Sequence, residues 1–157
     1  MEAYKIALDL QIPVFFHNTA TTQQSTLDYA QPYLLDEIAR EFPELKMVVA
    51  EMGYPFREQT LALIKKHPNV YACLRVNSNF TFRLYHDVTA AYEASVLDKL
   101  FFGSGYPQGQ INESVESLLG FNRTFADTQL GSVPRAQLRE IVERDALEIL
   151  GIVKEDI

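Results

Sequence analysis

The sequence predicts an α/β protein of about four strand-to-helix units with parallel strands, followed by a C-terminal helix. Short apolar runs alternate with longer segments of helical periodicity along the chain. The apolar runs have the length of strands and are apolar enough to be covered on both faces, as in parallel sheets. The 157 residues, 47% of them hydrophobic, are enough to bury a core. We therefore expect one domain over residues 1–157.

Four runs are predicted as strands: 13–17 (PVFFH), 46–51 (KMVVAE), 70–75 (VYACLR) and 99–103 (KLFFG). Each is followed by polar or turn-forming residues and then by a helical pattern, which is the order of a βα unit. A further helical pattern over 1–11 leads directly into the first strand.

Proline and glycine delimit the predicted helices. We expect helices over about 32–42, 57–67 and 82–97, and another that starts near Asn112. The last helix is predicted to run from near Pro134 to Leu150, because its apolar positions form one broad face and Gly151 follows as a C′ residue.

Charge and composition exclude several partners. The 14 Lys and Arg against 21 Asp and Glu leave a net charge of −7, which repels a nucleic-acid backbone. No apolar stretch approaches the ~20 residues that cross a bilayer, so we expect no membrane partner. Cys73 is the single cysteine, which we expect to be a buried apolar residue in a reducing compartment. A cytoplasmic location is therefore predicted.

The pattern IPVFFHNTATT, FPELKMVVAEMGYPF, HPNVYACL and KLFFGSGYP, with a terminal LEILGI, resembles the amidohydrolase-related (amidohydrolase 2) family. Members are metal-dependent hydrolases and decarboxylases with a (β/α)8 TIM barrel. The resemblance covers nearly the whole chain and corresponds to strands five to eight. Since a complete barrel normally needs about 250 residues, it implies a partial TIM barrel, the C-terminal half of the fold.

The resemblance also assigns metal positions. Family members hold a metal, often zinc, with a His-x-His pair on strand one, a His ending strand five, a His ending strand six and an Asp ending strand eight. His17 matches the strand-five ligand, Glu51 stands in place of the strand-six His, and Gly105 stands in place of the Asp. His17 and Glu51 are thus the candidate ligands, and two ligands hold zinc or another divalent metal weakly or not at all.

These positions and several others each have a second interpretation. His17 could be a leftover imidazole held by local hydrogen bonds, and Glu51 could be a solvated loop acid. Asn18, Tyr54 and Tyr106 are candidates for substrate binding at the mouth that contains His17, or are capping and packing residues. His67 is expected to be an ordinary surface histidine. The glycines of the GSGYP segment (103–107) are a weak indication of phosphate binding.

No catalytic residue can be assigned, because Gly105 can neither bind a metal nor accept a proton. Three functions remain open: a metal-dependent hydrolase or decarboxylase of a small carboxylated or cyclic substrate, completed by another chain; a non-catalytic interaction or small-ligand-binding remnant of the fold; or a fragment of a longer gene. We favour a truncated, degenerate metal site with weak or no activity alone. The open sheet edges of a partial barrel predict self-association or a chain that completes the barrel.

Overall fold

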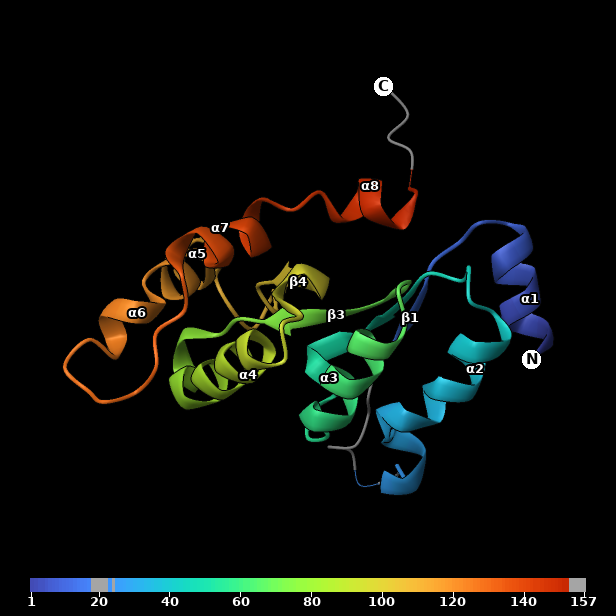
Figure 1. Cartoon of the computed structure of the whole chain (residues 1–157), viewed down its shortest axis with the longest axis horizontal. Helices are drawn as coiled ribbons and strands as arrows, with labels where there is room; N and C mark the ends of the chain where they lie inside the picture. The colour runs from blue at the N-terminus through green and yellow to red at the C-terminus, as the bar shows by residue number, and fades with distance from the viewer. Residues whose placement is uncertain (18–22, 24, 153–157) are drawn as a thin grey trace. The chain divides into compact units, whose positions relative to one another are not determined.

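The computed structural model describes residues 1–17, 23 and 25–152, in which helices and parallel strands alternate (Figure 1). The strands are β1 (Val14–Phe16), β2 (Met47–Val49), β3 (Val70–Arg75) and β4 (Leu100–Gly103), in the order β1-β2-β3-β4. β1 pairs with β2 and β2 with β3, both in parallel, with Phe15 opposite Val48 and Val48 opposite Tyr71. The predicted α/β class with parallel strands is confirmed.

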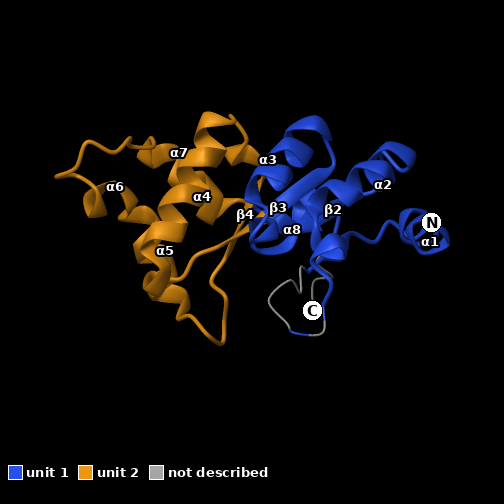
Figure 2. Ribbon diagram, turned by 90° about the horizontal axis from the view of Figure 1, so that it is seen from below, with its two compact units in different colours: residues 1–72, 145–157 blue, residues 73–144 orange. Residues whose placement is uncertain are grey.

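The chain divides into two compact units, and the boundary falls inside β3 (Figure 2). The first unit comprises Met1–Ala72 and Asp145–Ile157, and the second comprises Cys73–Arg144. The prediction of one domain over residues 1–157 stays a prediction.

The first unit contains strands β1 and β2, the start of β3, and helices before and after them. Its helical segments are α1 (Glu2–Asp9), η1 (Leu27–Ala30), η2 (Pro32–Leu34), α2 (Leu35–Glu41), η3 (Ala50–Gly53), α3 (Arg57–Lys66) and α8 (Ala146–Leu150). In α3, Glu58 lies in the first turn while Lys65 and Lys66 lie in the last, which suits the helix dipole. The core of this unit includes Met47, Val48, Ile64 and Val70, none more than 1% exposed.

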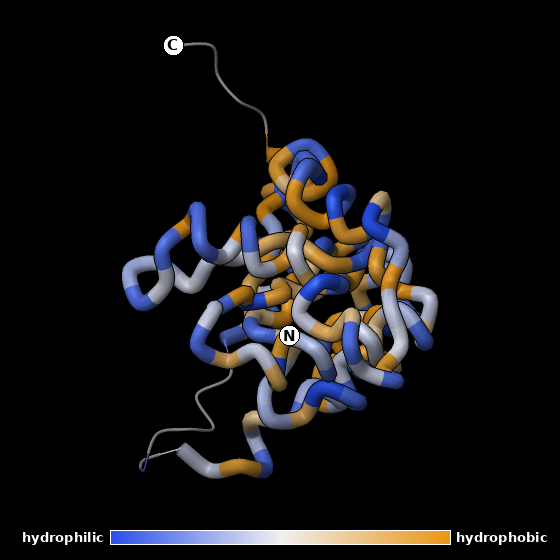
Figure 3. Tube along the Cα trace, turned by 90° about the vertical axis from the view of Figure 1, so that its left-hand side faces the viewer, coloured by the Kyte–Doolittle hydropathy of each residue, from blue (hydrophilic) through white to orange (hydrophobic). Residues whose placement is uncertain are grey.

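The second unit contains the end of β3 and strand β4. Its helical segments are η4 (Ser78–Phe80), α4 (Thr81–Glu93), η5 (Leu97–Lys99), α5 (Ile111–Leu119), α6 (Phe121–Thr124) and α7 (Arg135–Glu143). Figure 3 shows hydrophobic and hydrophilic residues interspersed along the Cα trace, and in α4 the buried Leu84, Val88 and Ala91 recur at helical spacing. Helix α7 buries Leu138 and Ile141 and contacts β4 and α5.

The last predicted helix is in fact two helices, so the prediction of one continuous helix from Pro134 to Leu150 is wrong. α7 ends at Glu143, and Arg144 has an extended backbone with ψ of 125°. The Arg144 guanidinium donates to the carbonyls of Leu97 (3.0 Å) and Leu100. Asp145 then caps α8 by accepting from two backbone amides. A periodic apolar pattern does not report this interruption, because both helices bury apolar residues.

Burial alternates strictly along β3, as a strand with one more open face requires. Val70, Ala72 and Leu74 are buried, whereas Tyr71, Cys73 and Arg75 are only partly buried. The expectation that Cys73 is buried is therefore wrong, because Cys73 lies on the more open face of its strand.

His67 is also not a surface histidine, since it is only 9% exposed. Its Nε2 lies 2.7 Å from Asp36 Oδ1, and Lys66 Nζ lies 2.6 Å from the same oxygen. The hydrogen bond from His67, and to a smaller extent the one from Lys66, holds the pKa of the Asp36 carboxyl below its ordinary value of 3.8. The cluster joins α2 to the end of α3.

The helices of the part of the chain that the structure describes are too short or too polar to span a bilayer.

Candidate functional site

In the first unit the candidate site lies where β1 and β2 end, since ligands of parallel α/β folds bind beyond the carboxyl ends of the strands. His17 directly follows Phe16, the last residue of β1, and is exposed. Because Phe16 pairs with Val49, His17 is level with Ala50, one residue before Glu51. The pairing of β1 with β2 thus brings the two predicted metal-ligand positions to the same edge of the sheet.

Glu51 begins a left-handed turn directly after β2. Glu51, Met52 and Gly53 have φ of 51°, 54° and 66°, although only glycine adopts such values without strain. Met52 is 1% exposed, so burial of its side chain in the core holds the turn in place. A Cβ at Gly53 would lie 2.2 Å from Thr60 Oγ1 and 2.6 Å from Pro32 Cγ. The turn that carries Glu51 is therefore packed against α3 and η2 with no space for a side chain at Gly53.

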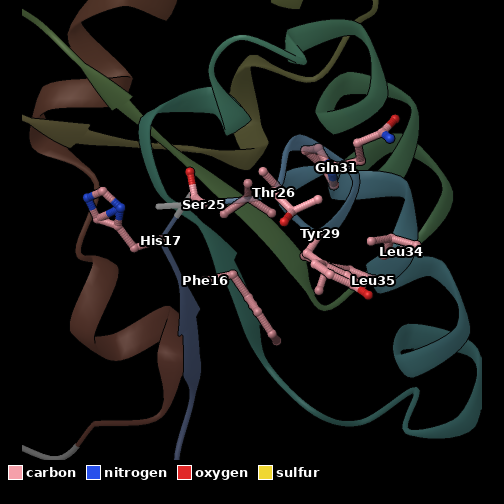
Figure 4. A pocket seen from close by; sticks show the side chains of 11 residues that line it. Phe16, His17, Ser25, Thr26, Tyr29, Gln31, Leu34 and Leu35 are labelled. Atoms are coloured by element: carbon pink, nitrogen blue, oxygen red, sulfur yellow. The ribbon is translucent and has the colours of Figure 1, made fainter. Parts of the chain in front are cut away.

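A cavity of about 390 Å³ opens beside His17 (Figure 4). His17 and Phe16 point in different directions from the end of β1, as successive strand residues do. The cavity lies on the Phe16 side and His17 lies at its rim. The lining residues are Phe16, His17, Ser25, Thr26, Tyr29, Ala30, Gln31, Pro32, Leu34, Leu35 and Val49.

The cavity combines an apolar wall with a few polar groups, which is typical of small-molecule sites. Gln31 is held from outside, because Gln59 Nε2 donates to Gln31 Oε1 at 3.0 Å. Gln59 Oε1 in turn accepts from the amide of Tyr33 at 3.4 Å. Tyr29 is 85% exposed, so its ring lies at the open side of the site.

In the second unit the ends of β3 and β4 form a separate candidate site. The amide of Val76 donates to Gly103 O at 2.7 Å, so the two strands end side by side. Gly105 follows with φ of +68°, in the left-handed region. This is the position at which the resemblance expects an Asp.

Arg75 occupies the space beside Gly105. A Cβ at Gly105 would lie 2.6 Å from Arg75 Nε, 3.3 Å from Cγ and 3.4 Å from Cδ. Arg75 Nη2 also donates to Gln108 Oε1. The side chain therefore runs from the end of β3 across Gly105 to the loop after β4, and a cation stands where a carboxylate is expected.

Among the predicted substrate-binding residues, Asn18 lies outside the described residues. Tyr54 is 45% exposed and is not among the described residues that line the cavity. Tyr106 is 71% exposed in the second unit, where its amide donates to Ser104 Oγ at 3.3 Å. Substrate binding by these residues stays a prediction.

The residues present do not fit a catalytic metal, which normally has three protein ligands and an open position. Within residues 1–17, 23 and 25–152, no three His, Cys, Asp or Glu side chains gather as a metal site would require. His17 and Glu51 are two candidates in the first unit, and Arg75 would repel a metal ion at Gly105. No catalytic step through a metal follows from these residues.

Sequence reasoning missed Arg75 and most of the cavity lining. A signal for Arg75 was present, because it is the only charged residue in 71–82 and 100–112. The lining residues Thr26, Tyr29 and Leu35 belong to segments whose path over β1 and β2 is tertiary information, so the sequence carries no local signal for them.

Comparison with known families gives one finding that covers nearly the whole chain. The family described as amidohydrolase matches residues 1–152. Comparison with curated proteins gives no match.

Two solved structures are similar to this chain in fold. The first is an uncharacterised TIM-barrel protein from Bordetella bronchiseptica, with 19% identity and a TM-score of 0.67 over 96% of this chain and 50% of that one. The second is a probable 2-pyrone-4,6-dicarboxylic acid hydrolase from Acinetobacter baumannii with citric acid bound, with 16% identity and a TM-score of 0.51 over 96% and 56%. The chain thus spans about half the length of these structures, and the predicted partial barrel is confirmed.

Proposed function

This chain belongs to the amidohydrolase family, and we propose that it is a half-barrel member that binds a small organic molecule and has no complete hydrolytic metal site. Its activity alone is weak or absent.

The observation that carries the proposal is the contact between Arg75 and Gly105. A hydrolytic site of this family needs a carboxylate there, both to hold the metal and to accept a proton. With a glycine and an adjacent guanidinium, the position can do neither. His17 and Glu51 alone would hold zinc or another divalent metal weakly.

Binding is supported by the cavity beside His17. Its volume of about 390 Å³ suits a small molecule, and its apolar lining includes Phe16, Leu34 and Leu35. Gln31 and Thr26 add polar groups that can orient a ligand. Of the substrates expected from the sequence, small carboxylated or cyclic compounds, the ring of a cyclic compound suits such an apolar wall.

We further propose that the chain associates with itself or with a chain that completes the barrel. β1 is at the end of the strand order, and its Phe15 is 59% exposed. Ile6, Leu10 and Ile12 before β1 are each more than half exposed. An open edge strand flanked by apolar side chains favours association. The predicted cytoplasmic location rests on the single cysteine and stays a prediction.

Sedimentation velocity tests this association. The wild type is expected to sediment as oligomers at tens of micromolar, and Phe15→Lys is expected to shift it towards monomer. A monomeric wild type would contradict the proposed association.

A second candidate function is an enzyme whose site another chain completes. The exposed position of His17 at the rim of the cavity favours it, because a ligand from outside could reach the imidazole. Neighbouring coding sequence with a His-x-His pair would favour this function strongly.

Turnover assays decide between the two functions. The wild type is incubated with zinc or manganese and a panel of cyclic amides, lactones and aromatic carboxylates. The proposed function predicts no turnover by this chain alone. Metal-dependent turnover that His17→Ala abolishes would instead establish the enzyme.

A further inference from the structure

We propose that the cavity beside His17 in the first unit selects an uncharged cyclic ligand and rejects the corresponding carboxylate. This ligand class rests on the proposed function, since it concerns the same cavity. It departs from the carboxylated compounds that the family resemblance allows, because the lining of this chain has no charge with which to hold them.

The lining is the first observation. Among the lining residues that the structure describes, no Asp, Glu, Lys or Arg occurs, and all except Val49 lie within residues 16–35. By sequence, Asp28 is the only Asp, Glu, Lys or Arg in the longer range 10–35, although 22% of the chain is charged. The one such charge in this range is therefore an acid, and the range supplies no lysine or arginine to pair with a carboxylate.

A carboxylate would enter such a cavity at a cost. Transfer of a charged group out of water is unfavourable unless an opposite charge or several hydrogen bonds replace the water. Asp28 is an exposed acid of η1, and the chain as a whole carries −7, so the surrounding field also repels an anion. A neutral amide or hydroxyl loses far less hydration, which one hydrogen bond can offset.

The polar groups of the lining suit a neutral partner. Gln59 Oε1 accepts from the backbone amide of Tyr33, which can only donate, so Gln59 turns its nitrogen to Gln31 Oε1. The remaining polar atoms of Gln31 are thus N–H donors. Thr26 adds a hydroxyl that can donate and accept. The lining therefore offers neutral hydrogen-bonding groups to an oxygen of an uncharged ligand, beside an apolar wall for its ring.

His17 is the lining side chain that can become a cation, and Figure 4 shows it at the rim, pointing away from Phe16. Measurements at about pH 8, where an imidazole is ordinarily neutral, therefore report the preference of the wall itself.

Two matched pairs of compounds test the ligand class: benzamide with benzoate, and cyclohexanecarboxamide with cyclohexanecarboxylate. Isotope-labelled wild type is titrated with each at about pH 8 and constant ionic strength. Binding is followed through the methyl signals of Leu34, Leu35 and Val49, which line the cavity. Both amides are expected to give saturable shifts. Each carboxylate is expected to bind at least about tenfold more weakly than its amide, because its charge finds no partner in the wall.

A charged variant tests the cause of this preference. Thr26→Lys adds a positive charge to the lining at an exposed position that can accommodate a long side chain. It is expected to raise the affinity for benzoate relative to benzamide by about tenfold. Thr124→Lys is the matched control, since it adds the same charge at an exposed threonine of the second unit, and it should keep the wild-type preference.

A carboxylate that binds wild type as tightly as its amide, or more tightly, would overturn the uncharged ligand class and leave the proposed binding function standing. A wild-type preference in Thr26→Lys would contradict the role of charge in the lining. Absence of saturable shifts with all four compounds would overturn both the ligand class and the proposed binding cavity, so the two failures are distinguishable.

Discussion

In the first unit, His17 and Glu51 follow the ends of β1 and β2, and both an imidazole and a carboxylate can bind a metal cation. In the second unit, β3 ends in Arg75, which lies beside Gly105 in the loop after β4. His17, Glu51 and Gly105 stand at the positions to which the family resemblance assigns metal ligands, whereas Arg75 ends the neighbouring strand. The first unit keeps an imidazole and a carboxylate, whereas the second has a glycine with a cationic side chain beside it. The backbone fold tolerates this difference, because strands and core set the fold while the strand ends set the chemistry.

In both units a glycine with a left-handed backbone follows the strand ends, but the side chains beside the two glycines differ. Gly53 and Gly105 have nearly the same left-handed backbone, with φ of 66° and 68°. The space beside Gly53 is filled by Thr60 and Pro32, short side chains held by the core. The space beside Gly105 is filled by Arg75, a long side chain that can move. The first turn is therefore rigid, and the second can adapt.

The largest expected effect comes from Gly53→Ala. The added methyl group would meet Thr60 Oγ1 at 2.2 Å in a conformation that alanine disfavours. We expect a loss of unfolding free energy on the order of 3 kcal/mol in urea denaturation. Gly131→Ala, at an open position, should change stability by no more than about 0.5 kcal/mol. Equal losses for the two variants would contradict the rigid turn.

Gly105→Ala should have a smaller effect. The left-handed conformation costs alanine about 1 to 2 kcal/mol, and displacement of Arg75 adds little because its side chain is flexible. The same urea denaturation measures it beside Gly53→Ala. If Gly105→Ala were the more destabilising variant, the contrast between a rigid and an adaptable strand end would be wrong.

Asp36→Asn tests the cluster of Asp36, Lys66 and His67, and it is expected to change mainly the pH dependence of the unfolding free energy. The pKa of Asp36 is lowered in the folded state, so its stabilisation is present above the ordinary value of 3.8 and is lost as pH falls through the folded value. Wild type should therefore lose stability more steeply than Asp36→Asn on acidification below about pH 4. Unfolding curves at successive pH values measure this. Parallel losses would show that Asp36 does not stabilise the fold in this way.

Much of the fold could be predicted from the sequence. Residues 70–75 were predicted as a strand with the bounds of β3, because a short apolar run lies between a proline turn and polar residues. The interruption between α7 and α8 could not be, since it depends on Arg144 reaching carbonyls of residues 97 and 100. The apolar spacing of a segment depends on that segment alone, so it cannot indicate a hydrogen bond to a residue that is distant in sequence.

The site was predicted less completely than the fold. The family pattern located His17, Glu51 and Gly105, and it described Gly105 as the loss of a carboxylate. The structure adds that Arg75 fills the vacated space, which no spacing rule connects to a residue 30 positions away. His67 was misjudged for a similar reason, because its partner Asp36 lies on another helix.

The most direct test of the central claim is the zinc content of the purified protein after mild dialysis, measured by elemental analysis for wild type and His17→Ala. The glycine at position 105, the Arg75 side chain beside it, and a set of two candidate ligands, His17 and Glu51, predict well under one equivalent of zinc per chain, for both proteins. A full equivalent in wild type that is lost in His17→Ala would contradict the claim and show that other ligands complete a metal site.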